Sequence, residues 1–180
     1  MYRIILSKGR QLAAFFFIWK IIFYVISNIN CFSMIFAITP INKASALSYD
    51  YSNPYSTGCA YKSPITYETK YIYSRNGVKI GYLQLKGSAY CHTAWGYVKF
   101  YSAASYNYYA KAIVNSYTNG TTRRTFTDCA SSGGNGMVMK SQTSCYTPQL
   151  WDKDPYKASA EVWIYTSDGW GTQNAITGRH

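Results

Sequence analysis

The sequence contains few of the residues on which enzyme active sites and metal centres usually depend. Among its 180 residues are two histidines, His92 and the terminal His180, and seven acidic residues. The cysteines show no C-x-x-C spacing, no G-x-S-x-G segment occurs, and no acidic calcium loop is evident. A zinc site, a serine-hydrolase elbow and a calcium site are therefore not indicated. We expect neither a metal nor another cofactor.

The N-terminal part of the chain is its longest apolar region. Arg3, Lys8 and Arg10 precede an apolar stretch over residues 12–38, and Ala44-Ser45-Ala46 is a small-x-small cleavage pattern. This arrangement predicts an export signal over residues 1–46, whose removal leaves one secreted β-rich domain over residues 47–180 with no membrane span. The alternative is a retained anchor, because residues 19–41 nearly supply the roughly 20 apolar residues of a span.

Acidic residues are also scarce in the predicted mature domain. Nine lysines and four arginines stand against five aspartates and two glutamates, a net charge of +6, and 18 residues are tyrosine. A basic exported protein is attracted to anionic polymers, although such a charge also serves solubility alone. Nucleic acid is not an expected partner, because the compartment is wrong and no basic helix is evident.

The cysteine count is compatible with disulfide bonds. Cys31 lies in the predicted signal, which leaves four cysteines in the mature domain: Cys59, Cys91, Cys129 and Cys145. An even number in an oxidising compartment predicts two bridges, for which three connectivities exist. We favour the sequential pairs Cys59–Cys91 and Cys129–Cys145, each worth about 3–4 kcal/mol in the chain-entropy model.

No long helical periodicity follows Ala46, and the composition favours strands. Asn-Gly or Asp-Gly turn pairs begin at residues 76, 119, 135 and 168. Strand-like runs lie over residues 65–74, 78–86, 95–102, 109–117, 122–128 and 159–166. The pattern predicts an all-β fold, a small antiparallel barrel or sandwich of about six or seven strands stapled by disulfides. Residues 129–158 are interpreted as one long irregular loop.

Alternation within these runs predicts which side chains are buried. Val98 and Phe100 share one side of their strand, and Ala112 and Val114 share one side of theirs. Gly81 lies inside the second run and predicts a bulge or a close approach of two backbones.

The pair Cys91-His92 has the residue types of a nucleophile and its base. Neighbouring side chains of a strand point to opposite faces, and an oxidised cysteine has no thiolate. We interpret the pair as a disulfide cysteine beside a bystander histidine, and we assign no catalytic residue. A hydrolase that uses His92 with a carboxylate is the weakest alternative, and activity unchanged in a His92→Ala variant would remove it.

Aromatic side chains are better candidates for ligand contact. Trp151 and Trp170 lie in loop-like sequence, whereas Trp95 and Trp163 lie in strand-like runs and are expected to be packed. Aromatic rings with polar edges suit interfaces and stacking on sugar faces. The candidate ligand-binding residues are therefore Trp151, Trp170, Tyr106, Tyr108 and Tyr109. Filling of sheet faces is the competing interpretation.

Three stretches carry a family resemblance. They are NPYSTGCA at residues 53–60, IGYLQL at residues 80–85 leading to Cys91, Thr93 and Trp95, and TPQLWD at residues 147–152. Together they resemble the YjfA-like family of small secreted proteins of Gram-positive bacteria, a domain of unknown function. The resemblance implies export, a single β-rich domain and a shared Cys59–Cys91 bridge. It supplies no catalytic residue, because the family has no established activity.

These features predict a secreted, non-enzymatic protein that acts outside the cell. Its expected partner is an anionic cell-envelope polymer, a glycan or another protein, bound through a basic, tyrosine-rich surface. A secreted toxin or inhibitor is the first alternative, since a compact stapled domain suits that role equally.

Overall fold

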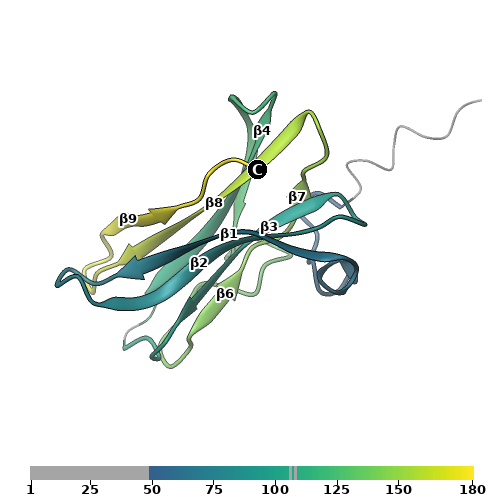
Figure 1. Ribbon diagram of the computed structural model, residues 1–180. Coiled ribbons are helices and arrows are strands. Elements are labelled where there is room, and N and C mark those ends of the chain that lie inside the picture. Colours follow the sequence, from purple (N-terminus) through teal and green to yellow (C-terminus); the bar gives the residue numbers. More distant parts are fainter. Residues whose placement is uncertain (1–48, 106, 108) are drawn as a thin grey trace, which may run out of the picture. The chain divides into compact units, whose positions relative to one another are not determined.

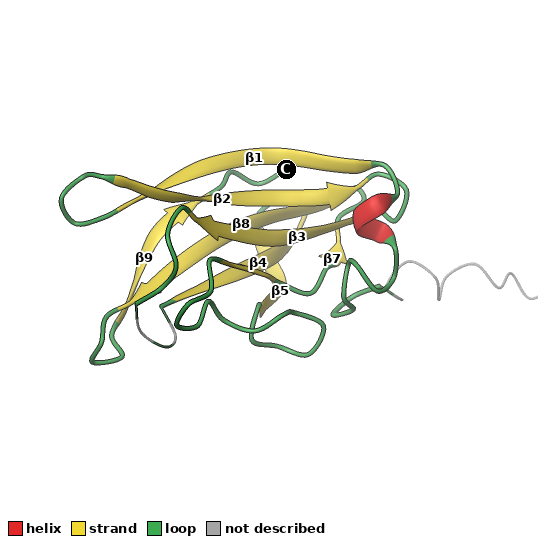
Figure 2. Cartoon of the chain, turned by 90° about the horizontal axis from the view of Figure 1, so that it is seen from below, coloured by secondary structure: helices red, strands yellow, loops and turns green. Residues whose placement is uncertain are grey.

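The computed structural model describes residues 49–180 except residues 106 and 108, so the predicted export signal lies outside the described residues. The described chain forms nine strands and one short 3-10 helix, η1 (Cys59–Tyr61). The strands make two antiparallel sheets that pack face to face (Figures 1 and 2). The predicted all-β sandwich is confirmed, and the sheets do not close into a barrel. No described helix has the length and apolar character needed to cross a bilayer.

Each sheet is built from strands that are mostly consecutive in the chain. The first sheet has the order β1-β2-β3-β6, and β7 also pairs with β3. Its strands are β1 (Pro64–Tyr73), β2 (Lys79–Ser88), β3 (Thr93–Phe100), β6 (Ser144–Tyr146) and β7 (Leu150–Trp151). The second sheet has the order β5-β4-β8-β9. Its strands are β4 (Ala110–Thr118), β5 (Thr122–Asp128), β8 (Tyr156–Tyr165) and β9 (Gly171–Ile176).

The interpretation of residues 129–158 as one loop is wrong. The segment contains β6 and β7, and its last residues begin β8. β6 has three residues and β7 has two, so neither is long enough to show the alternation by which a strand is recognised.

The core lies between the two sheets and follows the predicted alternation. Leu83, Leu85, Val98 and Phe100 point inward from the first sheet and are buried. They meet small or branched side chains of the second sheet, namely Ala112, Val114, Ala158, Ala160 and Val162. The predicted inward faces of β3 and β4 are therefore confirmed.

Two irregularities in β1 and β2 adjust the register of the first sheet. Gly81 approaches the backbone of Lys99 so closely that a Cβ would collide with its carbonyl oxygen, which confirms the predicted close approach. The pairing of β1 with β2 shifts between Ile72 and Tyr73, and again between Thr66 and Glu68. The second shift inserts Tyr67 as an extra residue in β1, a β-bulge.

The disulfides have the sequential connectivity. Cys59 bonds Cys91 and Cys129 bonds Cys145, with Cα–Cα distances of 5.8 Å and 6.1 Å. The first bridge fastens η1 to the connection between β2 and β3. The second joins the residue after β5 to β6, and therefore links one sheet to the other. The N-terminal segment is fastened further by the Gln149 side chain, which donates to Ser52 Oγ (2.9 Å) and Thr57 Oγ1 (3.0 Å).

Candidate functional site

The outer face of the first sheet carries an array of tyrosine and lysine side chains. Leu83, Leu85 and Val98 point into the core, so the residues that alternate with them point outward. The pairing register places Tyr71 opposite Tyr82, and Tyr82 opposite Lys99. We call this surface the tyrosine–lysine face and define it by Tyr71, Tyr82, Tyr97, Tyr101, Tyr146, Lys79, Lys86 and Lys99.

The rings of this face contact one another across strands. The Tyr82 ring centroid lies 6.3 Å from those of Tyr97 and Tyr101. Tyr55, from the N-terminal segment, places its ring 4.6 Å from that of Tyr146. Burial raises the pKa of the Tyr82 hydroxyl, and the neighbouring tyrosines Tyr97 and Tyr101 raise it further. The Tyr82 hydroxyl is therefore a neutral hydrogen-bonding group at physiological pH.

The lysines of the face lie against aromatic rings. Lys79 Nζ lies 3.5 Å from the centroid of the Tyr71 ring, and Lys86 Nζ lies 5.4 Å from that of Tyr97. Lys99 Nζ donates to Thr143 Oγ1 at 2.7 Å. Cation–π contacts hold an ammonium group in place without neutralising its charge. The face thus presents ammonium groups that lie against tyrosine rings.

The strands of the first sheet contain a single acidic residue, Glu68, which faces away from the tyrosine–lysine face. Glu68 pairs with Leu85, whose side chain is in the core. Its carboxylate accepts from Gly178 N (2.6 Å) and forms an ion pair with Lys70 Nζ (2.7 Å). The pKa of Glu68 is lowered to about 2, chiefly by the hydrogen bond from Lys70. The strands of this sheet therefore place no carboxylate among the outward lysines.

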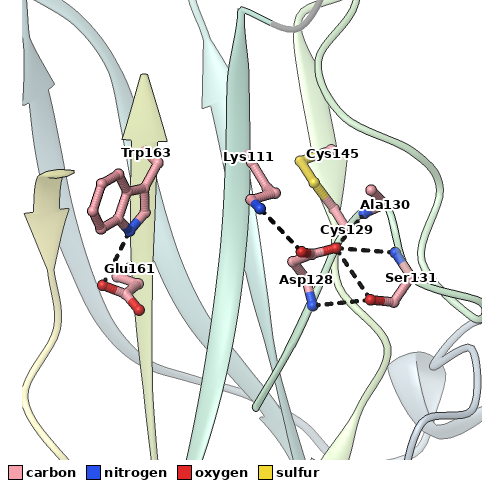
Figure 3. Close-up of polar contacts among 8 residues, drawn as sticks. All are labelled: Lys111, Asp128, Cys129, Ala130, Ser131, Cys145, Glu161 and Trp163. Carbon is pink, nitrogen blue, oxygen red and sulfur yellow. Dashed lines mark hydrogen bonds and ion pairs between the residues drawn. A yellow bond between two sulfur atoms is a disulfide. The ribbon is translucent and has the colours of Figure 1, made fainter. Parts of the chain in front are cut away.

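The second sheet differs because it carries carboxylates with close polar partners, two of which, Asp128 and Glu161, are drawn in Figure 3. Lys111 Nζ lies 3.2 Å from Asp128 Oδ2, and Asp128 Oδ1 also accepts from the backbone N–H groups of Ala130 and Ser131. Glu161 accepts from Trp163 Nε1 (3.3 Å) and Asn115 Nδ2 (3.2 Å), and also from Gln173. Arg123 of β5 lies over the Phe126 ring, 4.9 Å from its centroid. The second sheet therefore mixes acidic and basic side chains, whereas the strands of the first sheet place no carboxylate among their outward lysines.

The structure does not gather the predicted ligand-binding residues into one site. Trp151 lies in β7, where its ring contacts His92 edge-on at 5.6 Å, whereas Trp170 is 77% exposed in the turn between β8 and β9. β7 and that turn lie at opposite ends of the sandwich (Figure 2). Tyr109 packs on Phe100 with 4.9 Å between ring centroids. Tyr106 and Tyr108 lie outside the described residues.

The residues expected to have a structural role are buried or half-buried, or lie in a disulfide. Trp95 is fully buried, and Trp163 is half-buried beside Glu161. Cys91 is in its disulfide, so the interpretation of this residue as a bridge cysteine is confirmed. His92 follows it with a left-handed backbone (φ 53°), and its carbonyl oxygen accepts from the backbone N–H of Asp152.

Sequence reasoning missed a buried carboxyl group, that of Asp152. The segment Asp152-Lys153-Asp154 has the composition of a solvated turn, yet Asp152 is half-buried, and its Oδ1 atom is shielded from solvent without a hydrogen-bond partner. Burial raises the pKa of Asp152 to about 7, although the hydrogen bond from the Tyr67 hydroxyl opposes the shift. The Tyr67 ring in turn stacks on the His180 ring, 5.8 Å between centroids. No sequence signal marks this arrangement, because it depends on the bulge at Tyr67. Within the described residues no group of three or more His, Cys, Asp or Glu could hold a metal ion.

Comparisons with other proteins agree with the resemblance noted in the sequence. A family model described as a protein of unknown function, DUF2690, matches residues 47–161, which include β1 to β7 and all four bridge cysteines. The uncharacterized protein YjfA of Bacillus subtilis (strain 168) is 34% identical over 113 residues, 63% of this chain and 69% of that protein. No solved structure matches the chain. The chain therefore belongs to the DUF2690 family of proteins of unknown function.

Proposed function

We propose that the protein is exported and binds an anionic polymer of the bacterial cell envelope through the tyrosine–lysine face. The observation that carries this proposal is the unequal distribution of charge between the two faces of the first sheet. Lys79, Lys86 and Lys99 project from a sheet whose strands turn their only carboxylate, Glu68, the other way. Two disulfides support the export part of the proposal, because such bonds persist in oxidising compartments.

The spacing of the lysines favours an extended ligand over a small anion. Lys86 and Tyr82 are four residues apart on β2, and Lys99 lies opposite Tyr82. Lys79 is three residues beyond Tyr82. At a rise of about 3.3 Å per residue, the three positive positions follow one another at intervals of about 13 Å and about 10 Å. A chain with repeated negative groups can contact all three, while one isolated phosphate or carboxylate can contact one.

The tyrosines between the lysines supply the contacts that a charged polymer needs along its uncharged parts. Aromatic rings with hydroxyl edges pack against the apolar faces of sugars and polyols and hydrogen-bond to their hydroxyl groups. Tyr71 and Tyr101 are 48% and 56% exposed, so their rings are accessible. The face therefore suits a polymer that alternates anionic and hydroxylated units.

The double substitution Lys86→Gln/Lys99→Gln tests the proposal. A basic residue near an anionic surface contributes about 1 kcal/mol, so the loss of two predicts a roughly 30-fold weaker affinity at low salt. The measurement is the binding isotherm of the full secreted protein on isolated Bacillus subtilis cell walls. The same walls stripped of their phosphate-containing polymers by acid should retain little of either protein.

The matched control is Arg123→Gln/Lys157→Gln, which removes the same charge from strands β5 and β8 of the second sheet. The exposed Lys157–Asp154 pair that it breaks is worth little. We expect the control to bind walls nearly as the unmodified protein does, with the salt dependence of binding reduced only in the first variant. Equal weakening of both variants would reduce the interaction to net charge and refute a dedicated face.

A further inference from the structure

A pocket opens at one end of the tyrosine–lysine face. Its volume is about 270 Å³, and it lies between the start of β2 and the chain that leaves β3. The residues that line it include Ile80, Phe100, Tyr101, Ser102, Ser105 and Tyr109. Phe100 is almost fully buried, and its ring meets the Tyr109 ring edge-on, so these two rings are held in place by the core.

The lining of the pocket has two chemical characters. Ile80, Phe100 and the Tyr109 ring are apolar, whereas Ser102 and Ser105 are exposed residues that bring hydroxyl groups. Lys79 also lines the pocket and brings an ammonium group. An alkyl chain would make no use of the hydroxyl and ammonium groups, and a bare anion would gain nothing from the rings. A pyranose ring has an apolar face and a hydroxylated edge, and it matches both characters.

The volume limits the ligand to a single ring. Pockets for drug-sized molecules span about 300–1,000 Å³, and this one lies just below that range. Two or more linked sugars would have to extend out of it. The direction in which they would extend is set by the two residues that belong to both the pocket and the tyrosine–lysine face, Tyr101 and Lys79. The Tyr101 ring lies 6.3 Å from that of Tyr82, and Lys79 Nζ lies over the Tyr71 ring.

We infer that this pocket binds one hexose or N-acetylhexosamine unit, a branch or terminal residue of the polymer that lies along the tyrosine–lysine face. The inference rests on the proposed function for the polymer, and it adds the chemical class of the unit that is recognised. The lysines would hold the charged backbone of the polymer, and the pocket would select polymers that carry a sugar.

The direct test uses free monosaccharides and the intact secreted protein. Glucose and N-acetylglucosamine are titrated separately into ¹⁵N-labelled protein, and amide chemical shifts are recorded. We expect saturable shifts, at millimolar concentrations of at least one sugar, confined to the amides of residues 79–80 and 101–105. Glycerol 3-phosphate, which lacks a ring, should leave these amides unchanged. Absence of saturable shifts with both sugars would overturn the inference.

Two tryptophan substitutions at exposed positions provide the matched comparison. Ser102→Trp fills the pocket from its rim, whereas Thr122→Trp adds the same side chain at the start of β5 in the other sheet. We expect Ser102→Trp to abolish the sugar shifts and to weaken wall binding about threefold to tenfold, and Thr122→Trp to change neither.

The outcomes for the pocket and for the polymer face are separable, because Lys86→Gln/Lys99→Gln leaves the pocket lining intact. If the unmodified protein shows the sugar-induced amide shifts but has no affinity for cell walls, the sugar-binding pocket is supported and the proposed function is refuted. Wall binding that depends on the two lysines and is unaltered in Ser102→Trp, together with no sugar shifts, would refute the pocket alone.

Discussion

Replacement of Cys59 and Cys91 by alanine is expected to lower the free energy of unfolding by about 4 kcal/mol. The bridge spans 32 residues, and the chain-entropy model assigns roughly that value to a loop of this length. Small domains have a total stability of only about 5–15 kcal/mol, so the loss is a large fraction of it. The measurement is urea denaturation at pH 7, compared between the double variant and the unmodified oxidised protein.

The second bridge serves as the internal comparison for this experiment. Cys129 and Cys145 are 16 residues apart, and the same model gives about 3 kcal/mol for their removal. Cys59→Ala/Cys91→Ala should therefore be the less stable of the two double variants. All four cysteines are buried, so alanine also leaves small cavities in both cases. A Cys59→Ala/Cys91→Ala protein that unfolds at the same urea concentration as the parent would show that the bridge does not restrain the unfolded chain.

The second large effect concerns Asp152 and the dependence of stability on pH. The pKa of Asp152 is about 7 in the folded protein because of burial, against 3.8 for an exposed aspartate. The folded state therefore holds this proton more tightly than the unfolded state, and stability falls as pH rises from about 4 to about 7. At 1.36 kcal/mol per pKa unit, the charged carboxylate costs on the order of 4 kcal/mol above pH 7.

Asp152→Asn removes the titration while it keeps an acceptor for the Tyr67 hydroxyl. We expect the variant to be more stable than the parent by up to about 4 kcal/mol at pH 8, with the difference shrinking steadily toward pH 5. Urea denaturation at four pH values between 5 and 8 measures this. Glu68 does not interfere, because its lowered pKa of about 2 confines its contribution to a loss of stability below pH 4.5.

Asp154 provides the control for this titration. It lies two residues from Asp152, but its side chain is 84% exposed and its charge is the smallest of the causes that act on the pKa of Asp152, so Asp154→Asn should change the pH profile only slightly. Parallel stability curves for the parent and Asp152→Asn across this range would contradict the assignment of a buried, uncharged carboxyl group.

The sequence allowed the prediction of strands that are long and alternate. β1 to β5 and β8 have seven to ten residues each, and all six were expected close to their observed bounds. β9 was missed for a different reason from β6 and β7. Its central residues, Thr172, Gln173 and Asn174, are polar and exposed, so no apolar alternation marks the strand. An edge strand held mainly by backbone pairing gives little signal in composition.

The chemical character of the candidate site was predictable from the sequence, but its location was not. Composition indicated a basic, tyrosine-rich surface, but the choice of Trp151 and Trp170 depended on the idea that ligand-contacting aromatics lie in loops. The aromatic rings that lie close together belong to strands instead. Tyr82 and Tyr97, for example, become neighbours only through the pairing register of β2 and β3. The buried carboxyl oxygen of Asp152 had no sequence signal, because its surroundings include a long-range neighbour, Tyr67.

The bulge in β1 lets the strand hold an extra residue without a change in the polarity of the outer surface. If Tyr67 paired with Leu85 in an uninterrupted register, Glu68 would lie on the exterior opposite Gln84 and Tyr71 would turn toward the interior. A related chain that lacks Tyr67 would pair Thr66 with Lys86 and Glu68 with Leu85 without interruption, so its outward side chains would be the same. Variation in length at this one position is therefore compatible with a conserved outer face.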